Sequence, residues 1–248
     1  MITAPDMAFL TAAGGVAGVI GTAGGITSLV SYPALLAVGL SPLAANVTNA
    51  VSLVGSGVGS SLGSRVELAG QQRMLRRWAP AAMAGGVTGA FLLLVTPAGV
   101  FNWIVPFLIA SASVLLLLQP RITARRGVRP NGHAHATAVV FLVSGYSGYF
   151  GAGAGILILS AMLLLVDPGL ARANALKNAV LMIADVLPAV AFALFGPVSW
   201  RAAVPLAVGA TLGGLVGPMI TRRAPPGRLR LAVAVMGFGL ASWLLVTA

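Results

Sequence analysis

The stretch GTAGGITSLVSY at residues 21–32 places a glycine cluster directly before an apolar run, and GAGAGILILSAM at residues 151–162 repeats that arrangement. Glycine tolerates tight turns and lets another group approach the backbone closely. Two such clusters within long apolar runs predict two reversals of the chain, each followed by a helix that begins near Ile26 or Ile156. Whether the protein is soluble or membrane-embedded depends on whether these reversals are surrounded by water or by lipid.

The composition of the whole chain indicates that this medium is a lipid bilayer. Of 248 residues, 58% are hydrophobic and 8% are charged, whereas soluble domains carry about 25% charged residues. Long apolar runs separated by short polar stretches are typical of membrane helices, and the polar–apolar alternation of barrel strands is absent. The sequence therefore predicts an all-α polytopic membrane protein.

The apolar runs divide evenly between two halves. Residues 1–120 form a first transmembrane repeat, residues 121–135 a basic cytoplasmic linker, and residues 136–248 a second transmembrane repeat. The predicted segments lie at about 7–20, 26–40, 44–63, 79–95, 100–119, 136–150, 155–166, 174–195, 200–220 and 229–247.

The two halves resemble each other in sequence. The glycines at 18, 21 and 25 match those at 148, 151 and 155 at a constant offset, and ANVTNAV at 45–51 is similar to ANALKNAV at 173–180. Agreement in both order and spacing indicates an internal duplication.

Charge placement predicts the orientation of these halves. Arginines cluster near residues 64–78, in the linker and near residues 222–230, and the positive-inside rule assigns such loops to the cytoplasm. Both termini are then periplasmic, and the segments 44–63 and 174–195 run in opposite directions. The halves therefore form an inverted repeat, which is typical of secondary transporters.

The first two segments of each half are shorter than the roughly 20 residues that span a bilayer. Each pair forms either a re-entrant hairpin of two short helices, which we favour, or two thin crossings. Three spanning helices complete each half. Irregular backbone at membrane depth must be covered by protein or must line a water-filled cavity, so the glycine clusters would be the hairpin tips.

The tips predict an anion site. A helix N-terminus presents unpaired N–H groups and a partial positive charge, so two tips that meet would create a pocket for negative charge. Alternatively, the glycines serve only close helix packing, which we favour for the remaining glycine-rich helices. Nearby amides and hydroxyls can also donate to an anion. The predicted substrate-binding residues are Gly24, Gly25, Thr27, Asn46, Asn49, Gly153, Gly155, Asn174, Lys177 and Asn178.

Lys177 and Asp185 are charges well inside an apolar segment. Such a residue costs at least about 2.5–3.5 kcal/mol on insertion scales, so it requires a function or a partner. Lys177 either attracts an anion or extends its ammonium to the cytoplasmic surface. Asp185 either carries a proton that is coupled to transport or pairs with Lys177. We predict that Asp185 is the coupling residue.

Other classes of function are disfavoured. The net charge of +11 comes from the loop arginines, so it indicates orientation rather than nucleic-acid binding. The chain lacks cysteine, and HAH at 133–135 is too little for a zinc site, so no metal or cofactor is predicted. GYSG at 145–148 matches the serine motif of rhomboid proteases, but both histidines precede it, so an enzyme is not expected.

The order of these motifs resembles the sulfite exporter TauE/SafE family, also called the toluene sulfonate uptake permease family. The pattern GxxGxxGGI at 18–26 is followed by Pro33 and by SPxxAxxTN at 41–49. The resemblance implies a bacterial inner-membrane permease for sulfite or an organosulfonate, with proton coupling and alternating access.

Two other functions stay open at this point: a non-transporting membrane scaffold or subunit, and an anion channel. The expected partners are a small anionic substrate and the lipid bilayer, without nucleic acid. The sequence leaves open whether the protein forms an oligomer.

Overall fold

The computed structural model describes residues 2–124, 132–166, 169–221 and 226–247, and within these ranges the chain is helical without strands. Each predicted segment corresponds to one helix, so the all-α prediction is confirmed. The helices are α1 (Ala4–Gly24), α2 (Ser28–Ala37), α3 (Pro42–Gly63), α4 (Gln72–Val95), α5 (Ala98–Ala124), α6 (Gly132–Tyr149), α7 (Ala154–Leu165), α8 (Leu170–Phe195), α9 (Trp200–Thr221) and α10 (Pro226–Thr247).

Helix α1 is longer than the predicted segment 7–20, and that boundary was wrong. Thr3 and Asp6 form a capping box in which the Thr3 amide donates to Asp6 Oδ2 at 2.8 Å, and this box starts the helix at Ala4. Helix α2, with 10 residues, and α7, with 12, are short as predicted. Helices α5 and α6 cover both ends of the predicted 121–135 linker, and residues 125–131 lie outside the described ranges.

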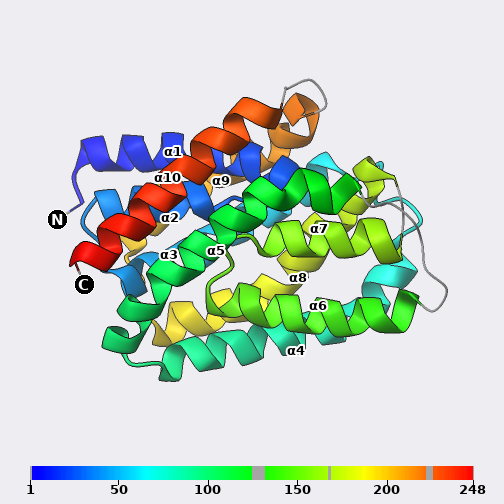
Figure 1. The fold of residues 1–248 in the computed structure, drawn as a ribbon, viewed down its shortest axis with the longest axis horizontal. Helices are drawn as coiled ribbons and strands as arrows, with labels where there is room; N and C mark the ends of the chain where they lie inside the picture. The colour runs from blue at the N-terminus through cyan, green and yellow to red at the C-terminus, as the bar shows by residue number, and fades with distance from the viewer. Residues whose placement is uncertain (1, 125–131, 167–168, 222–225, 248) are drawn as a thin grey trace.

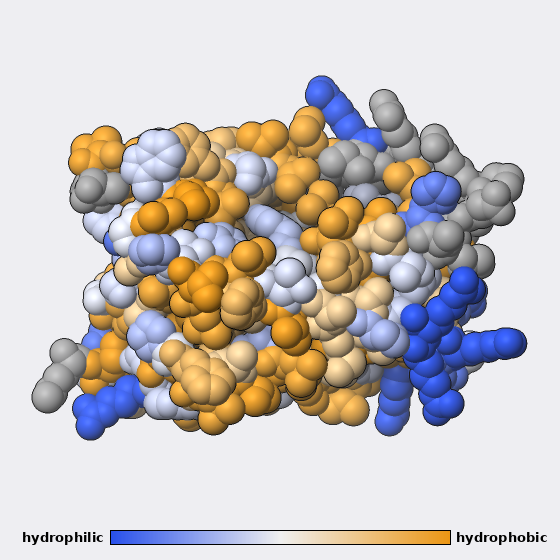
Figure 2. Space-filling model, turned by 90° about the horizontal axis from the view of Figure 1, so that it is seen from below, coloured by the Kyte–Doolittle hydropathy of each residue, from blue (hydrophilic) through white to orange (hydrophobic). Residues whose placement is uncertain are grey.

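Within the part of the chain that the structure describes, five helices are long and apolar enough to cross a membrane: α1 to Thr22, α4, α5 to Leu118, α8 from Ala171, and α9 to Gly217. Large apolar side chains such as Phe91, Trp103 and Leu194 are exposed on the outside of the bundle. Figure 2 shows these apolar flanks, with hydrophilic side chains gathered mainly at one end. The chain is therefore a multi-pass membrane protein, because lipid is the medium in which such flanks are stable.

The helices form a bundle with both termini at one end (Figure 1). Helix α1 packs along α9 and also touches α3, and α4 packs along both α6 and α8. Helix α1 begins at the end that holds the termini, whereas α6 begins at the opposite end. Helices α3 and α8 contact each other and carry residues of both halves to the middle of the bundle.

Glycines make the close contacts between these helices. A Cβ at Gly209 would overlap the Thr11 carbonyl of α1, and one at Gly89 would overlap the Gly145 carbonyl of α6. The same holds at Gly59 of α3 against Thr211 of α9. The prediction that the glycine-rich helices outside the two reversals form packing seams is confirmed at these positions.

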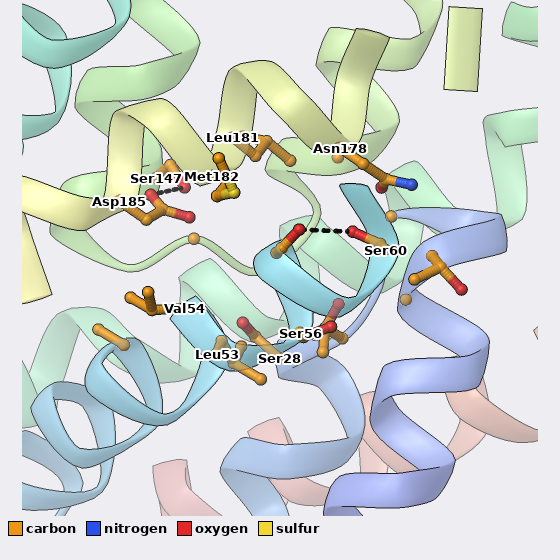
Figure 3. Close-up of a pocket in the computed structure, with 18 of the residues that line it drawn as sticks. Ser28, Leu53, Val54, Ser56, Ser60, Ser147, Asn178, Leu181, Met182 and Asp185 are labelled. Atoms are coloured by element: carbon orange, nitrogen blue, oxygen red, sulfur yellow. Dashed lines mark hydrogen bonds between the residues drawn. The ribbon is translucent and has the colours of Figure 1, made fainter. Parts of the chain in front are cut away.

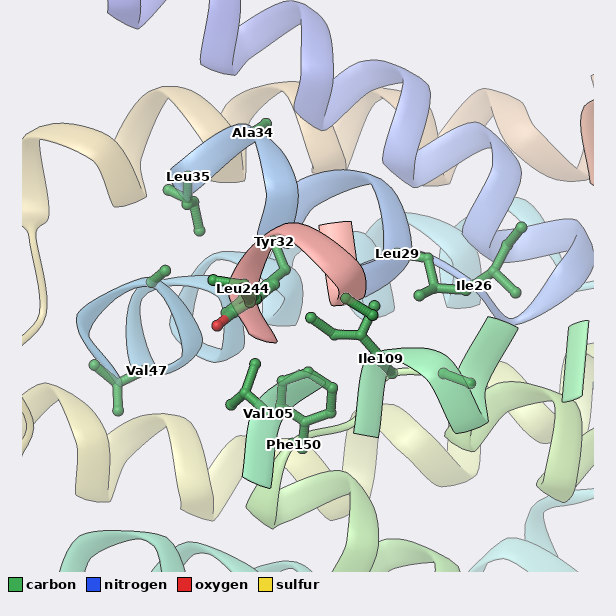
Figure 4. Close-up of a cluster of buried hydrophobic side chains, with 14 of the residues drawn as sticks. Ile26, Leu29, Tyr32, Ala34, Leu35, Val47, Val105, Ile109, Phe150 and Leu244 are labelled. Carbon is green, nitrogen blue, oxygen red and sulfur yellow. The ribbon is translucent and has the colours of Figure 1, made fainter. Parts of the chain in front are cut away.

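An apolar cluster lies beside the reversals and joins the two halves (Figure 4). The rings of Tyr32 in α2 and Phe150 after α6 meet edge to face, with centroids 5.5 Å apart. Phe101 of α5 lies next to both Tyr149 and Phe150. Edge-to-face aromatic pairs favour one relative orientation of the rings, so this cluster fixes the second reversal against α2 and α5.

Candidate functional site

The two glycine reversals meet directly in the middle of the bundle. Gly25, with φ of 71°, ends α1 in the left-handed region. A Cβ at Gly25 would overlap the backbone of Gly155, and a Cβ at Gly155 would overlap the backbone of Gly25. The approach is possible because neither residue has a side chain. The sequence predicted two reversals, and the structure brings them into contact.

Asparagines from the longer helices hold the helix ends that enter these reversals. Asn46 Nδ2 of α3 donates to the Tyr149 carbonyl at the end of α6 at 2.9 Å. Asn174 Nδ2 of α8 donates to the Thr22 carbonyl near the end of α1 at 2.8 Å. The last carbonyls of a helix lack partners within that helix, so each half supplies a donor to the reversal of the other half.

Lys177 is fully buried at the first reversal. Its ammonium donates to the carbonyls of Gly21, at 3.2 Å, and Thr22, at 3.1 Å. A cation is favourable at the negative end of a helix. The alternative in which Lys177 extends its ammonium to the cytoplasmic surface was wrong, because the side chain has no exposed area.

A cavity of about 90 Å³ lies between the reversals, α3 and α8 (Figure 3). Its size exceeds the roughly 30 Å³ that one water molecule occupies in the liquid. The lining combines backbone of both reversals with polar and apolar side chains. It comprises Gly21, Thr22, Gly25, Thr27, Ser28, Asn49, Ala50, Leu53, Val54, Ser56, Gly57, Ser60, Ser147, Phe150, Gly151, Gly155, Lys177, Asn178, Leu181, Met182 and Asp185.

Most of the predicted site residues line this cavity: Gly25, Thr27, Asn49, Gly155, Lys177, Asn178 and Asp185. Three others lie elsewhere. Asn46 and Asn174 bind the helix ends described above, and Gly153 lies against Ala112 of α5. Gly24 is the last residue of α1, and its surroundings fall outside the described part of the structure.

The two asparagines in the lining have different surroundings. Asn49 Oδ1 accepts from Ser31 Oγ at 2.6 Å, and Asn49 Nδ2 donates to Ser28 Oγ at 3.1 Å. Asn178 Nδ2 is enclosed and has no hydrogen-bond partner among the described residues. One amide is therefore fixed within the protein, whereas the other belongs to a residue of the cavity lining and has a donor without a partner.

Asp185 is half-buried at the cavity, and its Oδ1 accepts from Ser147 Oγ of α6 at 2.9 Å. Lys177 lies eight residues earlier on α8, or about 12 Å along the helix. Asp185 is hydrogen-bonded to Ser147 and Lys177 to the two carbonyls, rather than to each other. The cavity thus has a basic group toward one end of its α8 wall and a carboxyl group toward the other.

The part of the α3 wall that follows Asn49 was not predicted from the sequence. Ser56, Gly57 and Ser60 line the cavity opposite α8 (Figure 3). Serine recurs at every fourth position from 52 to 64, which places these hydroxyls on one helix face. That periodicity is the feature of the sequence that could have identified this wall.

Chemically, the site combines a buried ammonium, an unused amide donor and hydroxyl groups, which together suit an oxyanion. Among the residues that the structure describes, no three histidine or acidic side chains gather in a way that could hold a metal ion. The arrangement can therefore bind and release an anion by hydrogen bonds and charge.

Comparison with known proteins places this chain among membrane transporters. The family model for the sulfite exporter TauE/SafE matches residues 9–244. The probable membrane transporter protein ORF9 of Sinorhizobium sp. is 30% identical over 221 residues, covering 85% of this chain and 81% of its own. The probable membrane transporter protein YfcA of Escherichia coli K12 is 30% identical over 209 residues, covering 81% and 75%. No solved structure matches.

Proposed function

We propose, from the premise that the chain belongs to the sulfite exporter TauE/SafE family, that this membrane transporter carries a small sulfur-containing anion such as sulfite or an organosulfonate. The membrane is the bacterial inner membrane, and the termini are periplasmic. The substrate would bind in the cavity between the two reversals and reach each side of the membrane in turn.

The observation that carries this proposal is the fully buried Lys177 at the cavity, whose ammonium donates to the Gly21 and Thr22 carbonyls rather than to an acidic side chain of the described residues. Burial of an ammonium group is energetically unfavourable unless a nearby opposite charge or hydrogen bonds offset the loss of hydration. The carbonyls of Gly21 and Thr22 are neutral, so an anion in the cavity would add the missing opposite charge. Gly25 and Gly155 would let that anion approach the backbone, and Asn178 would supply a further donor.

Alternating access would follow from an inverted repeat of the two halves. In support, α1 and α6 begin at opposite ends of the bundle, and the α1–α9 contact has a counterpart in the α4–α6 contact. In transporters built from inverted repeats, substrate lies near the midplane while one unit moves against the other. The meeting point of Gly25 and Gly155 would be that fixed centre.

Proton coupling is assigned to Asp185. Its carboxyl group faces the cavity and is held by Ser147, so it can exchange a proton with water in the cavity without leaving its place. Protonation would remove a negative charge from the anion site and so favour binding. Proton and anion would then cross together.

The test is flux in liposomes that contain the purified protein. Radiolabelled sulfite and a labelled alkanesulfonate are supplied outside, with unlabelled anion inside. A transporter of these anions gives saturable exchange that a pH gradient accelerates. A channel gives flux without saturation, and a scaffold gives none; either result would end the proposal.

A further inference from the structure

The two halves supply different chemistry at positions that their sequences make equivalent. Asn49 and Asn178 are each the second asparagine of the similar stretches ANVTNAV (45–51) and ANALKNAV (173–180), and each is followed by Ala-Val. Both line the cavity and both are buried, with 2% and 7% of their surface exposed. A symmetrical site would use both amides in the same way.

The first amide is already occupied. Ser31 Oγ donates to Asn49 Oδ1 at 2.6 Å, and Asn49 Nδ2 donates to Ser28 Oγ at 3.1 Å. Both serines belong to α2, so these bonds tie α2 to α3. A substrate could take this amide only by breaking a contact between two helices.

The second amide has no such ties. At the offset of 130 that relates the glycine clusters, the positions of Ser28 and Ser31 are taken by Ile158 and Ala161 in α7. Ser160, the serine of α7, donates instead to the Ile156 carbonyl at 2.6 Å. Asn178 Nδ2 consequently has no partner among the described residues. An enclosed donor without a partner is costly. Of the buried side-chain atoms without a partner among the described residues, Asn178 Nδ2 is the one whose residue also lines the cavity, where a ligand would complete it.

We propose that Asn178, together with the adjacent Lys177, forms the selective oxyanion contact, while Asn49 only joins α2 to α3. This proposal rests on the proposed function, because it assigns the amide and the ammonium that select the anion in the same cavity to the second half. The recognised chemistry is an anionic oxygen that accepts from an amide N–H next to an ammonium.

The experiment compares Asn178→Ala with Ser31→Ala in detergent-purified protein. Sulfite and methanesulfonate are the probes, affinity is measured by calorimetry, and the melting temperature is measured without ligand. Losing one hydrogen bond to a charged group raises Kd about 10- to 100-fold, so Asn178→Ala is expected to weaken binding by that factor and to keep its melting temperature. Ser31→Ala is expected to keep the wild-type Kd and to melt earlier.

Asn49→Ala provides a second comparison, because it removes the amide in the first half. It is expected to melt earlier than wild type and to bind more tightly than Asn178→Ala. An equal loss of affinity in Asn49→Ala and Asn178→Ala, or unchanged affinity in Asn178→Ala, would overturn the division between the halves. If wild-type protein itself neither binds nor moves the probes, it is the proposed function that fails.

Discussion

Replacing Lys177 by methionine tests the central electrostatic feature of the site. The side chain has no exposed area, and its ammonium donates to the Gly21 and Thr22 carbonyls. Methionine has similar length and flexibility but neither the charge nor the donors. The substitution therefore removes the cation with little change in packed volume.

The expected loss of affinity follows from the charge. An anion about 4 Å from the ammonium gains about 4 kcal/mol at an effective dielectric constant of about 20. Loss of water from both groups reduces this gain, and hydrogen bonds to charged groups contribute about 1.5–3 kcal/mol net. Lys177→Met should therefore raise the Kd for sulfite about 10- to 100-fold.

Asn174→Ala is the matched control for this variant. Asn174 donates to the same Thr22 carbonyl at 2.8 Å but is absent from the cavity lining. The Asn174→Ala substitution therefore disturbs the end of α1 without changing the charge at the site. Calorimetry and liposome exchange on both variants separate the two effects. A Lys177→Met protein that is folded and keeps a Kd within about twofold of wild type, a change below about 0.5 kcal/mol, would refute the electrostatic reasoning.

Three further substitutions test other parts of the structure. Gly25→Ala places a side chain on left-handed backbone and makes it overlap Gly155, so it should destabilise the protein by about 2–5 kcal/mol. The measurement is the melting temperature, which should fall. An unchanged melting temperature would mean that the two reversals do not touch. Asp185→Asn should retain anion exchange but lose its acceleration by a pH gradient, and persistent acceleration would exclude Asp185 as the coupling group. The chain has no cysteine, so a single introduced cysteine reports its own side of the membrane. Ala98→Cys should react with an impermeant maleimide added from the periplasm, and Ala69→Cys should react only after lysis. The reverse pattern would show that the predicted orientation in the membrane is wrong.

The sequence predicted the helices well because each apolar run is separated from the next by glycine, proline or charge. It failed at the start of α1, where the capping box of Thr3 and Asp6 extends the helix beyond the apolar run. It also placed Asn46 and Asn174 in the site, whereas both amides bind helix ends. Helix periodicity puts residues on one face but does not say which acceptor lies opposite.

By itself, the sequence determined the membrane class, the ten helical segments and the duplicated glycine reversals. These features depend on local composition and spacing, because an exposed charge or an unpaired backbone group is energetically unfavourable in lipid. Only the tertiary structure decided that Gly25 touches Gly155, that Lys177 caps the opposite half, and that Asn49 is bonded while Asn178 is not. The contacts of Gly25 and Lys177 join residues more than 100 positions apart, and the bonds of Asn49 join two different helices. No local pattern encodes which carbonyl or hydroxyl of another helix a side chain will meet.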